Sequence, residues 1–232
     1  MNEFRNKEVL AIIVAMPEEF NTIMSVVGKP KKISAQNREF FCAKNICVIQ
    51  SSIGEIDASS ATEALFWFVK EQGGEVAQIL NVGVVGALRK SISIGQIFLT
   101  EKIVHYDFDI RAARENGRLG EYPDGQRFFA AETSLVEKLE GQVELATLAS
   151  GDKFIADPTK ICELVDQFDA HICDMEGAAV ARVAARHQVP VTMIKTVSDN
   201  GDHDEYEENL MPAMDNLKEI LKIILKDFSK AD

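Results

Sequence analysis

Apolar residues along the chain gather in short runs that alternate with stretches of helical spacing. The run Val9–Val14 is continuous and rich in β-branched residues, which is typical of a strand buried on both faces. Pro17 suits the first turn of a helix, and apolar residues then recur at helical spacing as far as Gly28. Further strands are expected at 40–42, 46–50, 78–82, 95–105, 143–149, 170–173 and 191–197, and further helices at 58–71, 135–139, 159–168, 177–187 and 214–228.

This order of elements predicts an α/β fold, a three-layer sandwich in which helices cover both faces of a central mixed β-sheet. Residues 106–127 are polar and rich in Gly, Asp and Arg, and they are expected to form a long loop. No repeat or low-complexity linker divides the chain. Residues 1–232 are therefore expected to form a single domain.

Composition narrows the classes of function. The 232 residues are 46% hydrophobic and 27% charged, which is typical of a globular protein. With 25 basic and 37 acidic residues the net charge is −12, which argues against a nucleic-acid partner. No apolar run approaches the ~18 residues of a membrane span, and no apolar leader opens the sequence. A cytoplasmic protein with no membrane partner is expected.

Motifs for metals and common cofactors are lacking in the sequence. The four cysteines form no C-x-x-C pair and the four histidines show no metal-ligand spacing, so no metal is expected. The Gly83-x-x-Gly86 element lacks the third glycine of a dinucleotide-binding turn, and no Walker sequence occurs. The sequence therefore predicts no cofactor.

Polar residues follow the predicted strands at four places: 16–19, 83–86, 174–176 and 198–200. In open α/β folds the carboxyl ends of strands carry the binding site. Each residue also has a purely structural interpretation. Glu19 fits the first turn of a helix, Asp174 a helix N-cap and Asp199 a turn. The joint pattern, more than any single residue, favours a site.

Six segments together give the sequence a specific resemblance. In order they are residues 12–19 (IIVAMPEE), 51–54 (SSIG), 81–86 (NVGVVG), 150–155 (SGDKFI), 174–179 (DMEGAA) and 197–199 (VSD). With this spacing the chain resembles the purine/uridine phosphorylase superfamily, and within it most closely the 5′-methylthioadenosine/S-adenosylhomocysteine nucleosidases. The resemblance implies a mixed sheet that curls toward a barrel, a homodimer, a purine nucleoside substrate and a place in methionine salvage.

Carried over residue by residue, the resemblance implies roles for ten positions. Glu19 resembles the acid/base that handles the attacking water, and Asp199, assisted by Ser198, resembles the general acid that protonates purine N7. Met175 and Glu176 resemble the ribose contacts. The remaining positions resemble base-packing and lining residues, namely Phe154, Ile155, Met16, Ile53 and Val84. Burial is expected to raise the pKa of Asp199 so that it holds a proton near neutral pH.

The sequence also bears on the choice between hydrolysis and phosphorolysis. Phosphorylases of this superfamily carry a Gly-Asp-Pro-x-Arg element after the first strand and an Arg before the glycine turn. Here Glu19 and Asn81 stand at those places. Phosphate is doubly charged and needs cations, whereas a carboxylate repels it. Water is therefore the expected nucleophile.

Several positions depart from the nucleosidase pattern. Val84-Val85 replaces Ser-Ala, Asp174 replaces Glu, and Lys195 replaces an Arg. The loop with Arg111 and Arg114 lacks an aromatic wall for a methylthio tail, and the two arginines are either ligands of an anionic 5′ tail or solvated loop charges. Two alternatives therefore stay open: a phosphorylase or nucleosidase for another nucleoside, and a non-catalytic or storage-type homologue.

Overall fold

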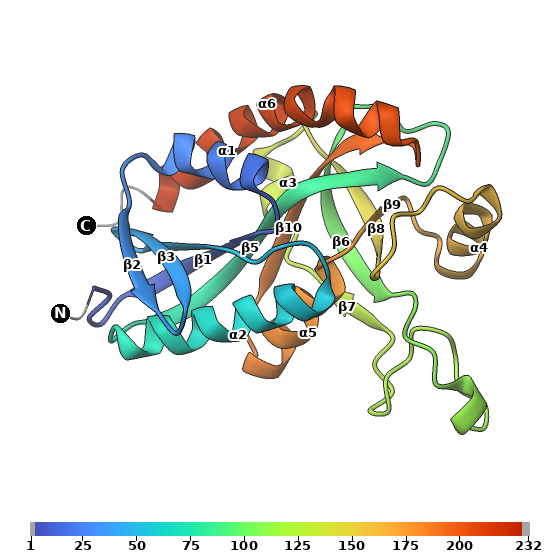
Figure 1. Cartoon of the computed structure of the whole chain (residues 1–232), viewed down its shortest axis with the longest axis horizontal. Helices are drawn as coiled ribbons and strands as arrows, with labels where there is room; N and C mark the ends of the chain where they lie inside the picture. Colours follow the sequence, from blue (N-terminus) through green and yellow to red (C-terminus); the bar gives the residue numbers. More distant parts are fainter. Residues whose placement is uncertain (1–2, 229–232) are drawn as a thin grey trace.

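The fold was obtained as a computed structural model, which describes residues 3–228, the last two of them by their backbone only. Strands and helices alternate along most of this span (Figure 1). The strands are β1 Glu8–Val14, β2 Lys31–Ala35, β3 Arg38–Ala43, β4 Ile46–Gln50, β5 Glu75–Ala87, β6 Ile97–His105, β7 Phe128–Ala130, β8 Glu144–Ser150, β9 Ile172–Asp174 and β10 Val191–Asp199. The helices are α1 Pro17–Val27, α2 Glu55–Glu71, α3 Leu135–Lys138, α4 Pro158–Phe168, α5 Gly177–His187 and α6 His203–Phe228, with a 3₁₀ turn at Arg111–Ala113.

Five strands of the sheet close into a barrel. β5 pairs with β10, β10 with β6, β6 with β8, β8 with β9, and β9 pairs back with β5. The sheet continues from β5 through β1, β4, β3 and β2 as an open extension. Parallel and antiparallel pairs are both present. The predicted mixed, partly barrel-like sheet is confirmed.

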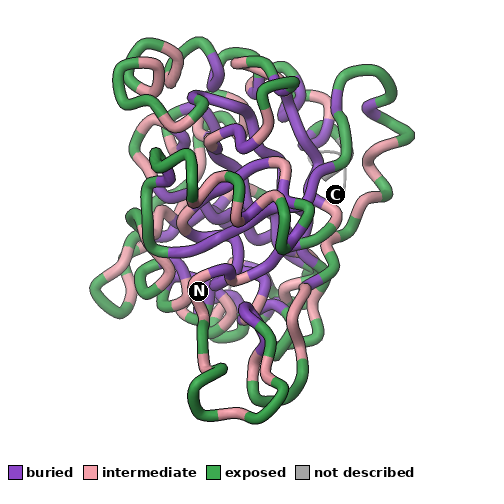
Figure 2. Tube along the Cα trace, turned by 90° about the vertical axis from the view of Figure 1, so that its right-hand side faces the viewer, coloured by how far each residue is buried: buried purple, intermediate pink, exposed green. Residues whose placement is uncertain are grey.

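Helices cover both sides of this sheet. α1 and α6 lie together on one side, and α2 and α5 lie together on the other (Figure 1). The strands between them are the most buried part of the chain (Figure 2). All nine residues of β10 are buried, as expected for a strand with helices on both faces. The structure therefore has the predicted three layers, and none of its described helices is long and apolar enough to cross a membrane.

Some elements differ from the sequence-based predictions. β2 and β7 were not predicted, because β2 is a polar edge strand and β7 has only three residues. β5 runs through Gly83 and Gly86, which the pattern suggested were the end of the strand. α6 begins at His203, well before the expected apolar stripe, because its first turns are acidic and exposed. The side chain of Phe228, expected in that stripe, lies outside the described residues.

The predicted long loop at 106–127 projects from the lower right of the molecule in Figure 1. Apart from its 3₁₀ turn it has no regular structure. It leaves the barrel at the end of β6 and returns at β7. The loop therefore begins at the edge of the barrel at which β8 and β9 also end.

Candidate active site

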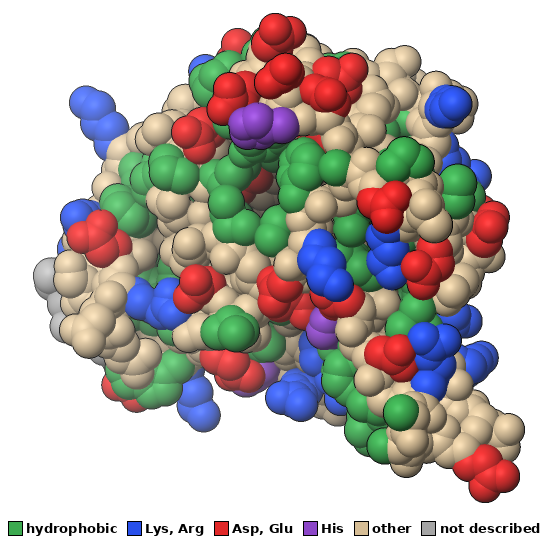
Figure 3. All heavy atoms as spheres, turned by 45° about the vertical axis from the view of Figure 1, so that its right-hand side comes forward, with side chains coloured by type: hydrophobic (Ala, Val, Ile, Leu, Met, Phe, Trp, Pro, Cys, Tyr) green, Lys and Arg blue, Asp and Glu red, His purple; other side chains and the backbone are tan. Residues whose placement is uncertain are grey.

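One cavity of about 310 Å³ brings the predicted site residues together. It opens as a hollow ringed by hydrophobic side chains (Figure 3). All ten residues predicted from the sequence line it: Met16, Glu19, Ile53, Val84, Phe154, Ile155, Met175, Glu176, Ser198 and Asp199. Their chemical roles remain proposals, but their common location is a feature of the fold.

The location follows from the strand directions. β1 runs parallel to β5, and β5 runs parallel to β10, so the carboxyl ends of these strands lie at the same edge of the sheet. β9 is antiparallel to β5 but short, and its last residue, Asp174, meets the same edge. Polar residues that follow apolar strands are therefore collected from distant parts of the sequence.

Glu19 is held in the first turn of α1 with its carboxylate facing the sheet. Its Oε2 accepts hydrogen bonds from the backbone N–H groups of Ala15 (2.8 Å) and Met16 (3.1 Å), and its Oε1 accepts one from Val84 (3.0 Å). The side chain is buried. Burial raises the pKa of Glu19, while Lys195 and the three N–H donors oppose that rise. The carboxyl can therefore take up and release a proton closer to neutral pH than a solvated Glu can.

The Glu19 carboxylate explains why β5 has a glycine at position 83. A Cβ at Gly83 would collide with Oε1 of Glu19, so only glycine lets the carboxylate lie against the strand. The helix-start interpretation of Glu19 is also correct, since its side chain caps the N-terminus of α1. The structural and functional interpretations of this residue are thus compatible.

Asp199 ends β10 on another wall of the cavity. Its Oδ2 accepts a hydrogen bond from the Ser198 hydroxyl (2.8 Å), and its Oδ1 accepts one from the Gly201 N–H (2.8 Å). Burial raises the pKa of Asp199 although these two donors oppose the rise. This is the predicted direction. The neighbouring strand approaches closely because its residue here is Gly86.

Glu176 follows β9 and faces the turn before α2. Its Oε1 accepts a hydrogen bond from the Gly54 N–H at 2.8 Å. Burial, reinforced by Asp174, raises the pKa of Glu176 to about 8. A second carboxylate oxygen is left for a ligand, and a buried acceptor of this kind suits vicinal sugar hydroxyls.

Asp174 and Lys195 form an ion pair beneath the cavity. Lys195 Nζ lies 2.7 Å from Asp174 Oδ2, and each side chain is 2% exposed. Burial lowers the pKa of Lys195, but Asp174, Glu176 and Glu19 raise it by more, so the amine stays charged. Asp174 also accepts the Gly177 N–H at 3.1 Å, but it is not the N-cap that the sequence suggested, because Glu176 stands at that position. One buried cation thus balances the acidic floor of the cavity.

Apolar groups and a few unpredicted side chains complete the walls. Phe154 is half exposed, and its ring meets that of Tyr206 edge-on at 6.2 Å between centroids. The Tyr206 hydroxyl lies 3.2 Å from Met16 Sδ. Tyr206 and His203 come from the acidic start of α6, where the apolar pattern gave no sign of a helix. The cavity can therefore enclose a flat ring between aromatic and aliphatic side chains.

Cations are scarce around the cavity. Among the described residues that line it, Lys153 is the only Lys or Arg. Arg111 and Arg114 lie elsewhere: the first pairs with Asp109 at 2.8 Å, and the second donates to the Tyr122 carbonyl at 2.9 Å. No group of three potential metal ligands occurs within residues 3–228.

Comparison with known proteins is consistent with this geometry. Residues 9–226 match the sequence model of the phosphorylase superfamily. The 5′-methylthioadenosine/S-adenosylhomocysteine nucleosidase of Shewanella pealeana is 28% identical over 218 residues, which cover 88% of this chain and 93% of that protein. The corresponding protein of Anoxybacillus flavithermus is 27% identical over 235 residues, covering 95% and 99%.

Solved structures agree with the sequence relatives. The Helicobacter pylori 5′-methylthioadenosine/S-adenosylhomocysteine nucleosidase with butyl-thio-DADMe-Immucillin-A superposes with a TM-score of 0.85 at 26% identity, covering 95% of this chain and 98% of that one. A futalosine hydrolase of the same species gives a TM-score of 0.85 at 25% identity with the same coverage. The barrel and its extension are thus shared across nearly the whole chain.

Proposed function

We propose that this chain, which belongs to the phosphorylase superfamily, is a nucleosidase that hydrolyses the N-glycosidic bond of a 5′-substituted adenosine. Methylthioadenosine and S-adenosylhomocysteine are the model substrates, and the products are adenine and the free sugar. The relatives named as nucleosidases of these compounds support the substrate class. One acid acts on the base, one on the water and one on the ribose.

The observation that carries this proposal is the placement of two buried acids against one strand. Glu19 binds the backbone of β5 at Val84, and Asp199 lies beside Gly86 on the same strand. Two residues of strand span about 7 Å. Both carboxyls have raised pKa values because they are buried. Two acids that can each exchange a proton therefore face one cavity from neighbouring positions along the same strand.

Asp199 is assigned to the leaving base. Cleavage of the glycosidic bond moves electrons onto the purine, and a proton delivered to N7 neutralises that charge. The Ser198 hydroxyl and the Gly201 N–H fix the carboxyl, and its raised pKa keeps a proton available. General acids placed in this way accelerate such steps by ~10²–10⁴-fold. Phe154 and Ile155 line the part of the cavity assigned to the base.

Glu19 and Glu176 are assigned to the sugar side. As the bond breaks, positive charge builds on the ribose, and the ionised form of Glu19 stabilises it. The three backbone N–H groups fix the Glu19 carboxylate, so a water bound to it would be held in place for attack at C1′. Glu19 takes the proton of that water, and Glu176 binds the ribose hydroxyls.

The charge around the cavity favours water over phosphate. Four acids line it (Glu19, Asp174, Glu176 and Asp199), and the described lining includes a single Lys at the surface. Asn81, at the place of a phosphorylase Arg, is buried and donates to the Ile13 carbonyl instead. A doubly charged phosphate would meet repulsion here. The intact Asp174–Lys195 pair also favours an active enzyme over a storage-type homologue, because it keeps the buried acids balanced.

The assembly and setting of the protein are also part of the proposal. Residues 1–232 are taken as one domain, supported by the continuous sheet. A homodimer is supported by exposed apolar side chains on α2, since Ile56 is 80% and Trp67 43% exposed. A cytoplasmic location is supported by four free cysteines. Release of adenine from methylthioadenosine would place the enzyme in methionine salvage.

Base release from a panel of nucleosides tests the proposal. Purified protein is incubated with methylthioadenosine, S-adenosylhomocysteine, adenosine and inosine, and the free bases are quantified by chromatography. Adenine should appear from a 5′-substituted adenosine, and Asp199→Asn should lower kcat ~10²-fold or more while substrate still binds. Turnover of inosine alone, or full activity of the Asn variant, would contradict the assignment.

A further inference from the structure

A histidine at the end of β6 lies in a cluster of acids beside the cavity. His105 Nε2 is 2.9 Å from Glu55 Oε2 and 3.0 Å from Asp107 Oδ1. Its side chain is 17% exposed. Ionised carboxylates only accept hydrogen bonds, so Nε2 must carry a proton that is shared between them. The imidazole therefore joins the first residue of α2 to the start of the 106–127 loop.

The same acids bind a third segment. The Glu55 N–H donates to Asp152 Oδ1 at 2.7 Å, and the Asp152 N–H donates to Asp107 Oδ2 at 3.2 Å. Asp152 stands two residues before Phe154, in the loop that forms one wall of the cavity. His105 thus lies at the centre of a ring of contacts that links α2, β6 and this wall.

The turn before α2 depends on such external contacts. Ser52 has φ 108° and Gly54 has φ 103°, and a positive φ at a serine is strained. Strained backbone persists only where its surroundings hold it. Between the two lies Ile53, which lines the cavity, and the Gly54 N–H is the donor bound to Glu176.

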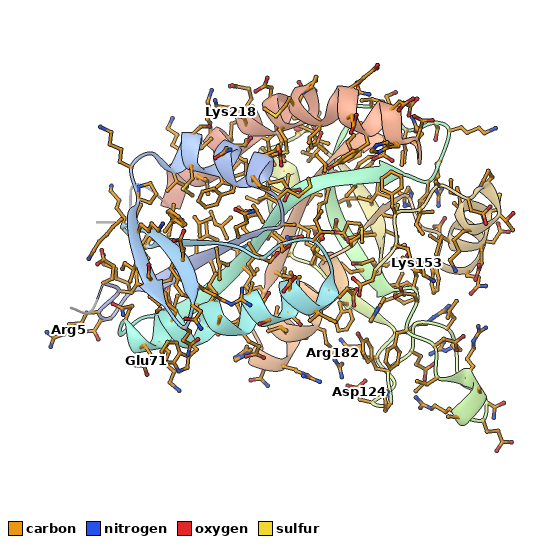
Figure 4. The ribbon with its side chains drawn as sticks, viewed as in Figure 1. Arg5, Glu71, Asp124, Lys153, Arg182 and Lys218 are labelled. Carbon is orange, nitrogen blue, oxygen red and sulfur yellow. The ribbon has the colours of Figure 1, made fainter. Side chains whose placement is uncertain are left out.

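The far side of the imidazole is also fixed. His105 Nδ1 lies 2.7 Å from the Tyr122 hydroxyl. The guanidinium of Arg182 lies 4.3 Å from the centroid of the Tyr122 ring and 2.7 Å from Asp124, so α5 contacts the 122–124 part of the projecting loop (Figure 4). The ring has little freedom to turn away from its two carboxylates.

The positive charge of His105 also offsets the repulsion between the two carboxylates that it contacts. Burial lowers the pKa of His105, but its contacts with Asp107 and Glu55 raise it by more, to about 11. Without a cation, the Glu55 carboxylate would face Asp107, and Asp174 lies near enough to raise its pKa as well. Like charges at this spacing would push the start of α2 away from the loop.

We propose that His105 is a positioning residue for the ribose subsite: as a cation between Glu55 and Asp107, it holds the Ser52–Glu55 turn so that the Gly54 N–H stays on Glu176. The inference rests on the proposed function, since it takes Glu176 as the ribose-binding carboxylate. His105 does not touch the substrate. It acts by fixing the orientation of Glu176, and its loss should therefore weaken recognition of the sugar hydroxyls in particular.

The test compares a 5′-substituted adenosine with its 2′-deoxy analogue. The ratio of kcat/KM for the two substrates measures recognition of the hydroxyl, and overall damage to the enzyme cancels in this ratio. In His105→Gln the preference for the ribose substrate should fall about tenfold, and His105→Lys should restore most of it because it returns the cation. His187→Gln is the matched control. His187 forms a similar pair with Glu63 (2.9 Å) between α5 and α2, away from the cavity.

The results separate this inference from the proposed function. Glu176→Gln should abolish the preference. If it does and His105→Gln leaves the preference unchanged, the positioning role is wrong. If Glu176→Gln keeps the preference, the ribose assignment itself is wrong. Equal losses in the Gln and Lys variants would overturn the role of the cation. Should His105→Gln not fold, Glu55→Gln should give a loss of about two- to fivefold, and an unchanged ratio there would overturn the inference.

Discussion

Lys195 Nζ lies 2.7 Å from Asp174 Oδ2 in the buried floor of the cavity. In the sequence these residues are two separate departures from the nucleosidase pattern, one in place of Glu and one in place of Arg. In the structure they are the two halves of one contact between β9 and β10. Each replacement keeps the charge of the residue that it replaces, and the shorter acid and the shorter cation are in direct contact, so the ion pair and the charge of the floor are both retained.

Removing one residue of the Asp174–Lys195 ion pair should destabilise the fold. Lys195→Met leaves Asp174 buried without its cation, and the free energy of unfolding should fall by about 3–5 kcal/mol. Urea denaturation measures this. Asp174→Asn combined with Lys195→Met removes both charges and should recover part of the loss. A single variant as stable as the wild type, or a double variant less stable than the single one, would show that the pair does not balance the floor.

A methyl group at position 83 should lower the activity by displacing the Glu19 carboxylate. In Gly83→Ala the new Cβ would clash with Glu19 Oε1, so the carboxylate must move and kcat should fall about tenfold or more. Gly86→Ala is the matched comparison. Its Cβ would lie 3.2 Å from Asp199 Oδ1, which requires only a small shift and predicts a smaller loss. Steady-state kinetics of the two variants decide this, and the reverse order of activity would be incompatible with the described position of Glu19.

The raised pKa of Glu176 predicts a pH dependence of stability. The folded protein holds a proton on Glu176 up to a pH of about 8, whereas the unfolded chain releases it near the ordinary Glu pKa of 4.5. The folded state thus binds more protons within this window, and its stability relative to Glu176→Gln should fall as pH rises from 5 to 8, by at least ~1 kcal/mol. Urea unfolding of both proteins at four pH values measures the difference. Parallel curves would mean that the carboxyl is ionised in the folded state.

Lys153, rather than the two loop arginines, should respond to an anionic 5′ tail. It lines the cavity, whereas Arg111 is paired with Asp109 and does not. Lys153→Met should raise KM for S-adenosylhomocysteine, which carries a carboxylate, about two- to fivefold more than KM for methylthioadenosine. Arg111→Ala should change both KM values equally. If Arg111→Ala raised KM for S-adenosylhomocysteine alone, Arg111 would be a ligand of the 5′ tail after all.

The sequence could predict the location of the site because the fold collects strand ends. Continuous apolar runs such as Val9–Val14 indicated buried strands, and the polar residues after them, including Glu19 and Asp199, had to meet at one edge of the sheet. The resemblance supplied Phe154 and Ile53, which no pattern of spacing would have indicated. These ten residues line one cavity.

Other parts of the site depend on contacts that no local pattern records. Tyr206 lies in an acidic stretch without apolar spacing, so its helix start was not predicted. His105 acquires its significance only through Glu55 and Tyr122, which are distant in the sequence. The β5 glycines suggested a turn, whereas they serve to bring a carboxylate close to a strand. The sequence thus predicted most of the helices and strands, but it could not predict the long-range contacts between side chains.

The identity of the nucleophile tests the central claim most directly. Turnover of methylthioadenosine is measured with and without phosphate, and mass spectrometry of the product distinguishes a free sugar from a sugar 1-phosphate. The proposed hydrolysis predicts sustained turnover without phosphate and a free sugar as the product. A sugar 1-phosphate whose formation rises with added phosphate would contradict the assignment of Glu19 to water.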